Sequence, residues 1–247
     1  MGDITFSNLW NESLDFFKKN FVLLFSLGFI FSYLPNILSD ISYYLRGINL
    51  TEFTPETMGV GEVIALLKGL LPNIIILSFL STFLVISLIF VVSSKNKKIS
   101  LGEVLNKSSG FYVKAILLSI LMFFFLTILF LLFIIPGIIF LIYWIFAYYV
   151  LVVEDCSIMD AFKGSKKIVK GRWWEVFFKF TLISIIMWVI NIIFSWISEV
   201  ILSLVPNLSE ITDIIISSIV LYFIPTLTFI FGAIFMMKYY LSLKGKK

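Results

Sequence analysis

Residues 115–153, AILLSILMFFFLTILFLLFIIPGIIFLIYWIFAYYVLVV, decide the fold class, because this run is apolar and contains no charged residue. A single helix over this run, at about 1.5 Å per residue, would be about 58 Å long. That is nearly twice the about 30 Å thickness of a bilayer's hydrocarbon core. Pro136 lacks a backbone donor and disfavours helix at the preceding residue, and Gly137 permits a turn. We therefore predict a helical hairpin that bends at Ile134–Gly137, with a second arm, Ile138–Val153, short enough to stop below the far interface.

The rest of the chain has the same apolar character. Of its 247 residues, 60% are apolar and 14% charged, whereas soluble domains are about 45–50% apolar and about 25% charged. Further stretches long enough to cross a bilayer are Phe21–Asn36 (extending towards Leu45), Val63–Val92, Val176–Val205 and Ile214–Met237. The sequence thus predicts an all-α polytopic membrane protein, with six transmembrane helices in three hairpins and a single integral membrane domain over residues 1–247.

The distribution of basic residues supports six spans. With the N-terminus inside, the cytoplasmic segments 1–20, 93–114, 154–179 and 238–247 hold 2, 5, 6 and 4 Lys or Arg residues, which is 17 of 19. Only Arg46 and Lys68 fall on the other side. This asymmetry satisfies the positive-inside rule, whereas five spans would place a lysine-rich loop outside. We predict a multi-pass protein of the cell membrane with both termini cytoplasmic.

Several chemistries are excluded by composition. The chain has no histidine, which excludes a histidine-based triad, a histidine metal ligand and a histidine proton relay. Its single cysteine, Cys156, can form neither an internal disulfide nor a cysteine-rich metal site. The net charge of +4 is too small to indicate nucleic acid binding. We expect no cofactor, no metal and no nucleic acid partner, and the sequence does not indicate an oligomeric state.

Three nine-residue segments share one pattern: TFSNLWNES at 5–13, SLGEVLNKS at 100–108 and SIMDAFKGS at 157–165. Each starts with a hydroxyl residue, has a polar or acidic residue three places later, and ends in serine. The first four positions predict a helix N-terminus, and apolar side chains then fall on one face. We predict a cytoplasmic interfacial amphipathic helix before each hairpin, and a threefold repeat with units 5–92, 99–153 and 157–243.

The third of these helices has a basic face. Its lysines recur at spacings of three and four residues, which places them on one stripe, and Arg172 and two indoles follow. Aromatic residues of this kind mark membrane interfaces, and near an anionic leaflet each basic residue contributes about 1 kcal/mol of attraction. The predicted binding residues for lipid or a protein partner are Lys163, Lys166, Lys167, Lys170, Arg172, Trp173 and Trp174. An ordinary solvated basic face remains the alternative.

The same region resembles a known family. The resemblance rests on Ile135-Pro136-Gly137-Ile138, Trp144–Val153, Glu154, Ala161-Phe162, Ser165 and Val169–Trp174. Over about 40 residues, 135–174, this pattern resembles the membrane domain of glycerophosphoryl diester phosphodiesterases and the related YciC-like membrane proteins. In fused members of that family, the phosphodiesterase activity belongs to a separate soluble domain. The resemblance therefore implies a membrane platform and assigns no catalytic residue to this chain.

Polar residues inside the spans are candidates for a second kind of site. Asn191 and Pro225 fall near the middle of the last two spans, whereas Asp40, Lys68 and Glu199 cluster towards the outer side, where Lys68 could pair with either carboxylate. Contacts between helices are one role for these groups, and a solute path is the other. The sequence therefore favours a non-enzymatic membrane platform whose partners are membrane lipids or a cytoplasmic protein. The alternative is a small-solute transporter or channel with a path lined by spans five and six.

Overall fold

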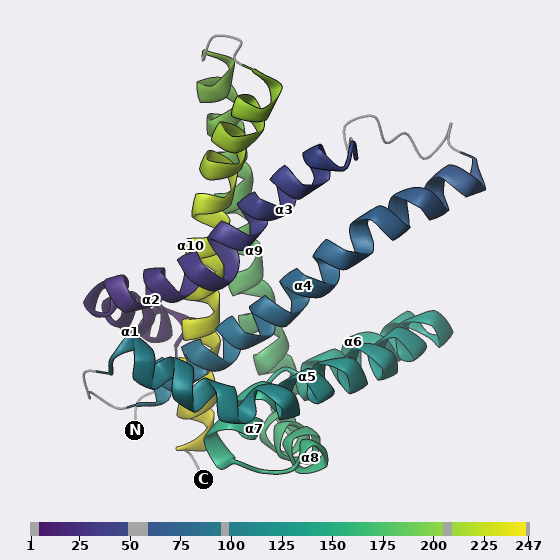
Figure 1. The fold of residues 1–247 in the computed structure, drawn as a ribbon. Helices are drawn as coiled ribbons and strands as arrows, with labels where there is room; N and C mark the ends of the chain where they lie inside the picture. Colours follow the sequence, from purple (N-terminus) through teal and green to yellow (C-terminus); the bar gives the residue numbers. More distant parts are fainter. Residues whose placement is uncertain (1–4, 49–58, 95–98, 205–208, 246–247) are drawn as a thin grey trace.

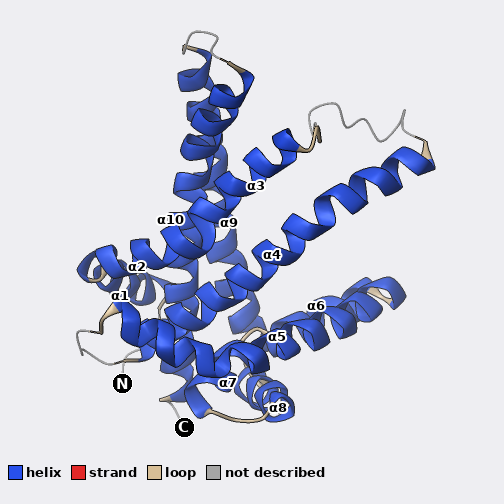
Figure 2. Ribbon diagram, viewed as in Figure 1, coloured by secondary structure: helices blue, strands red, loops and turns tan. Residues whose placement is uncertain are grey.

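The computed structural model describes residues 5–48, 59–94, 99–204 and 209–245. It is 91% helical, and the described residues contain no strand (Figure 2). The helices are α1 Phe6–Lys19, α2 Phe21–Gly28, the π-helix η1 Phe29–Tyr33, α3 Leu34–Leu45, α4 Val60–Ser93, α5 Leu101–Leu132, α6 Ile134–Trp144, α7 Ala147–Glu154, α8 Ile158–Val169, α9 Trp173–Ser203 and α10 Glu210–Lys244.

Within the described residues, six helical stretches are long and apolar enough to cross a membrane, which confirms the predicted fold class. Four of them are single helices, α4, α5, α9 and α10, of 31 to 35 residues each. The first stretch joins α2, η1 and α3 over Phe21–Leu45, and the fourth joins α6 and α7 over Ile134–Glu154. The predicted end of the fifth span, Val205, lies outside the described residues.

The hairpins share one end and diverge from it (Figure 1). We call the shared end the base; it contains both chain termini, α1, α7, α8 and the adjoining halves of α4, α5 and α10. The buried apolar side chains concentrate there, including Leu84–Val92 of α4 and Ile230–Leu243 of α10. Away from the base many large apolar side chains are exposed: Leu131 at the tip of α5 is 81% exposed and Trp196 of α9 is 72% exposed. Such extensive apolar surface is the kind that lipid covers.

The α5–α6 hairpin bends one residue earlier than the sequence predicts. Phe133 alone is extended, with φ −155° and ψ 122°, and the predicted bend residues Ile134–Gly137 already belong to α6. Pro136 is tolerated because it is the third residue of α6, where a backbone N–H would have no intrahelical partner. The second arm breaks at Ile145 and Phe146, between α6 and α7.

The N-caps of the three pattern segments are confirmed. Thr5 accepts from the Asn8 backbone N–H at 3.3 Å, Ser100 from that of Glu103 at 3.3 Å, and Ser157 from that of Asp160 at 3.2 Å. The first and third segments form the separate helices α1 and α8. The second does not: it forms the first turns of α5, which runs unbroken into its span. It stays helical through Ser108, Ser109 and Gly110, which have low helix propensity, and no proline interrupts it.

The serine that ends each pattern segment is fully buried. Ser13 donates to the Leu9 carbonyl, Ser108 accepts from Ser87 of α4 at 3.0 Å, and Ser165 bonds to the α6–α7 break. The apolar residue four places before each serine is buried as well: Leu9, Val104 and Ala161. The three segments therefore use the same two positions for packing, while the threefold repeat of whole units stays a prediction.

The apolar faces of α1 and α8 contact other helices of the chain. Phe6 and Trp10 of α1 pack on Phe235 and Phe231 of α10, with ring centroids 5.0 Å and 4.8 Å apart. On α8, Phe162 packs on Trp144 of α6 at 4.9 Å. Because protein covers these faces, the exposed side of each short helix is its polar side.

Candidate functional site

The backbone of α8 at Gly164 lies close against the Val150 side chain of α7. Asp155 ends α7 in the left-handed conformation, with φ 42°, and the chain reverses into the Ser157 cap. A Cβ on Gly164 would lie 2.8 Å from Val150 of α7, so only glycine allows this approach. At the other end Gly171 has φ 87°, which turns the chain into α9. Both ends and one face of α8 are thus fixed.

Three lysines of α8 and its C-cap residue Lys170 form what we call the α8 stripe (Lys163, Lys166, Lys167 and Lys170), and all four are exposed. No carboxylate among the described residues lies within 4 Å of any of their ammonium groups. Lys166 instead lies over the rings of Phe140 and Tyr143 of α6, at 5.7 and 5.6 Å. The α8 stripe therefore presents positive charge that the described part of the chain does not neutralise.

The predicted aromatic residues flank the stripe at the start of α9. Trp173 donates its indole N–H to the Ile139 carbonyl of α6 at 3.2 Å and stacks on Phe177 at 5.2 Å. Trp174 is 64% exposed, and Arg172, the N-cap residue of α9, is partly exposed. One indole is thus committed to holding α9 against α6, while the other is free to contact the surroundings.

Ser165 has a role that sequence reasoning did not assign. It donates to the Tyr143 carbonyl at 2.7 Å and accepts from the Phe146 backbone N–H at 3.1 Å. These are the backbone groups that the break between α6 and α7 leaves without helical partners. The serine that recurs at the ninth position of the pattern could have drawn attention to Ser165. The break between α6 and α7, whose backbone groups it bonds, cannot be recognised in the sequence.

The structure brings Asn191 and Pro225 together in a cavity of about 440 Å³ between α9 and α10. The Asn191 amide donates to the Met187 carbonyl at 2.8 Å and to the Thr228 hydroxyl oxygen at 3.1 Å. The other lining groups are mainly apolar and come also from α4 and α7, including Val85 and Tyr149. This groove can accept an apolar chain or a weakly polar solute.

The predicted outer polar cluster does not form as expected. Asp40 accepts from Ser218 at 2.7 Å and Tyr222 at 3.1 Å, both on α10, whereas Lys68 and Glu199 are exposed and form no described ion pair. The prediction that Lys68 pairs with Asp40 or Glu199 was therefore wrong. Hydroxyl donors on the neighbouring helix already satisfy Asp40, so it needs no long lysine to reach it.

Sequence reasoning missed a second outer network. Arg46 donates to the Gly69 carbonyl at 2.8 Å and to the Asn73 side-chain oxygen at 3.0 Å, and Asn73 donates to Ser39 at 2.8 Å. These bonds join the outer ends of α3 and α4. Arg46 and Asn73 are 27 residues apart in sequence, so no local pattern could have indicated the contact.

The turn between α7 and α8 holds the half-buried Cys156. Burial raises the pKa of its thiol, and the Glu154 and Asp160 carboxylates raise it further. Among the described residues, no group of three His, Cys, Asp or Glu side chains could hold a metal ion. The groups brought together at the base thus offer positive charge and hydrogen bonds.

Comparison with known proteins gives one match. Residues 54–243 match the profile of a domain of unknown function, DUF7847. No curated protein and no solved structure matches the chain.

Proposed function

The chain belongs to the DUF7847 family, and we propose that it is a non-enzymatic membrane platform whose α8 stripe binds anionic lipid. The carrying observation is that four exposed lysines lie on a helix whose opposite face is buried, without a described carboxylate partner. Because Gly164 and Ser165 hold α8 in place, its charges are displayed at fixed spacing. Little ordering free energy is then lost when a headgroup binds.

The orientation we propose places the base at the cytoplasmic leaflet of the cell membrane, with both termini cytoplasmic. Nearly all basic residues of the sequence belong to segments on that side, as the positive-inside rule requires. Trp174, exposed next to the stripe, is the kind of residue that lies at headgroup level. An acidic protein partner would use the same charges and is the competing occupant.

The test is lipid binding by the purified protein, measured by native mass spectrometry with added phosphatidylglycerol or phosphatidylcholine. We expect the wild-type chain to retain more phosphatidylglycerol. Replacing Lys163, Lys166, Lys167 and Lys170 by Gln should abolish that preference, because each charge contributes about 1 kcal/mol of attraction to an anionic surface. The preference should also fall as salt is raised.

A matched control is available on α5. Lys107 and Lys114 are exposed lysines of the base that already pair with Glu103 and Asp155, at 3.2 and 3.0 Å. Changing both to Gln should leave the lipid preference nearly unaltered. If the quadruple α8 variant kept the full preference, lipid binding through the stripe would be refuted. If lipid binding were unchanged but a cytoplasmic protein no longer bound, the stripe would be a protein-binding surface.

A small-solute transporter or channel is the second candidate, supported by the cavity that contains Asn191, Pro225 and Thr228. Asn191 is the polar group there that would contact a passing solute. Flux of a small uncharged solute into liposomes, abolished by Asn191→Leu and kept by the outer variant Glu199→Gln, would favour this function. Equal flux in protein-containing and empty liposomes would reject it.

We also propose that the family is related to the membrane domain of glycerophosphoryl diester phosphodiesterases and YciC-like proteins. The supporting residues are the Pro136-Gly137 pair and the Lys170–Trp174 run, now seen at the start of α6 and at the α8–α9 turn. A structure of such a domain should show a short basic helix seated against a broken arm through a buried serine. A domain without that helix would separate the families.

A further inference from the structure

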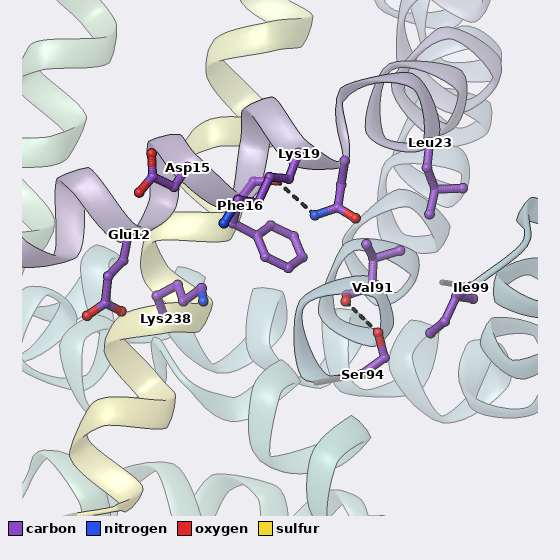
Figure 3. A pocket seen from close by; sticks show the side chains of 10 residues that line it. Glu12, Asp15, Phe16, Lys19, Leu23, Val91, Ser94, Ile99 and Lys238 are labelled. Carbon is purple, nitrogen blue, oxygen red and sulfur yellow. Dashed lines mark hydrogen bonds between the residues drawn. The ribbon is translucent and has the colours of Figure 1, made fainter. Parts of the chain in front are cut away.

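A second cavity, of about 620 Å³, lies in the base between α1, the start of α2, the end of α4 and α10 (Figure 3). Four charged side chains line it: Glu12, Asp15 and Lys19 of α1, and Lys238 of α10. Among the described residues, none of the four forms an ion pair within 4 Å. Among the described residues, two acidic and two basic side chains thus border one cavity without forming a direct ion pair.

Lys238 is the most constrained of these groups. It comes from the buried end of α10, where Met237 and Tyr239 on either side are buried, and it is itself only partly exposed. Its ammonium lies 5.1 Å from the centre of the Phe16 ring. A ring face compensates a cation only in part, by about 0.5–2 kcal/mol. An anion that enters the cavity could form an ion pair with the Lys238 ammonium.

The lining side chains are ordered across the cavity. In Figure 3 the carboxylates of Glu12 and Asp15 lie towards one side, and the apolar side chains of Leu23 and Ile99 lie towards the opposite side. Lys19 and Lys238 lie between them. From one side of the cavity to the other, these lining side chains are therefore first acidic, then basic, then apolar.

Polar groups without charge also line the cavity. Asn20 donates its amide N–H to the Phe16 carbonyl at 2.9 Å, which leaves its side-chain oxygen able to accept another bond. Ser94 donates to the Val91 carbonyl at 2.7 Å, so its oxygen can still accept. Both residues line the cavity.

We propose that this cavity binds a phospholipid whose headgroup carries both a phosphate and a primary ammonium. Such a molecule has its groups in the same order as the cavity: ammonium, phosphate, acyl chains. Glu12 and Asp15 receive the ammonium, Lys19 and Lys238 the phosphate, and Leu23, Val91 and Ile99 contact the start of the acyl chains. Among the described lining residues, acidic and basic groups are equal in number, which favours a headgroup of no net charge, unlike the all-basic α8 stripe.

The test is competitive retention of lipids by the full chain, measured by native mass spectrometry after washing in detergent. Phosphatidylethanolamine should be retained about tenfold better than phosphatidylcholine, because trimethylation removes the N–H donors that a carboxylate accepts from, and one such bond is worth about this factor. Glu12→Gln should abolish most of the difference, whereas Lys238→Gln should lower the retention of both lipids, because both carry the phosphate. Soluble glycerophosphoethanolamine should compete weakly, because it lacks the acyl chains.

Two controls separate this site from the rest of the base. Lys18→Gln changes a neighbouring exposed lysine of α1 that does not line the cavity, and it should leave retention unchanged. The quadruple α8 variant should also retain phosphatidylethanolamine, so this site and the proposed platform function can fail separately. Equal retention of the two lipids by the wild-type chain would overturn the proposal. So would full selectivity in a folded Glu12→Gln variant.

Discussion

The base and the outer halves of the hairpins differ in how far other helices cover their apolar side chains. In the base, Phe146, Tyr239 and Tyr240 are buried by other helices, and their ring centroids lie 5.9 Å apart in each pair with Phe146. In the outer half of α9, Trp196 is 72% exposed. The base also contains a polar network: the Tyr240 hydroxyl donates to Glu154, and Glu154 also forms an ion pair with Lys244 at 3.0 Å. Apolar packing between helices thus dominates in the base, whereas the outer halves are joined by a few polar bonds and expose many of their apolar side chains.

The largest effect should come from truncating the packed centre of the base. Phe146→Ala removes a ring from a fully buried site and should destabilise the protein by about 3–5 kcal/mol. Trp196→Ala removes a larger ring from the outer half of α9, where lipid can fill the space, and should cost far less. Reversible unfolding in mixed micelles measures both. Similar losses for the two variants would contradict the division between base and outer halves.

Ser165→Ala should have the next largest effect. It leaves the Tyr143 carbonyl and the Phe146 N–H without partners inside the base, at a cost of about 1–3 kcal/mol. Ser198 is a matched control because it is equally buried but bonds only to the Phe194 carbonyl of its own helix. Ser198→Ala should be nearly neutral in the same unfolding experiment. A neutral Ser165→Ala variant would show that the break in the second arm needs no hydrogen bond from α8.

Changes in the outer polar groups should have smaller effects. Asp40→Asn weakens the bonds from Ser218 and Tyr222 and should cost about 0.6 kcal/mol, the average for such bonds between membrane helices. Lys68→Gln should cost nothing, because Lys68 is exposed and forms no described ion pair. Melting temperatures of the two variants in one detergent compare them directly. If Lys68→Gln were the more damaging change, it would support an ion pair between Lys68 and Asp40 or Glu199.

The tips of two hairpins should differ in their surroundings without any change in stability. Residues Leu131 to Ile135 are exposed and wholly apolar, whereas Ser209 and Glu210 begin α10 with polar groups. A spin label on Phe133→Cys should therefore collide with oxygen and not with a water-soluble nickel chelate. A label on Ser209→Cys should do the reverse. Chelate access to position 133 would mean that the α5–α6 hairpin reaches the far aqueous phase.

The spans and the helix N-caps could be predicted because local composition and short spacing determine them. Residues 115–153 have no charged side chain and exceed one membrane crossing, so a hairpin is required whatever its partners. Ser100 and Ser157 are N-caps because the residue that donates to each lies three places away. The bend was predicted close to its place, but Pro136 suits the first turn of α6 as well as a loop, which is why Phe133 bends instead.

The contacts of the candidate sites could not be predicted in the same way. The four lysines of the α8 stripe share a face by spacing alone, but the burial of the other face against α6 and α7 depends on Gly164 and on a break 19 residues before Ser165. The cavity near Lys238 joins α1 to α10, from opposite ends of the chain. One sequence carries no signal for contacts at that distance.

We propose that the base, with the α8 stripe, faces the cytoplasm. It is tested most directly by labelling Lys167→Cys in a Cys156→Ala background with a membrane-impermeant maleimide, in sealed right-side-out vesicles. We expect no labelling at position 167 until the vesicles are opened, whereas Ser209→Cys in the same background should be labelled at once. Labelling at position 167 in sealed vesicles, with position 209 protected, would mean that the base faces the outside.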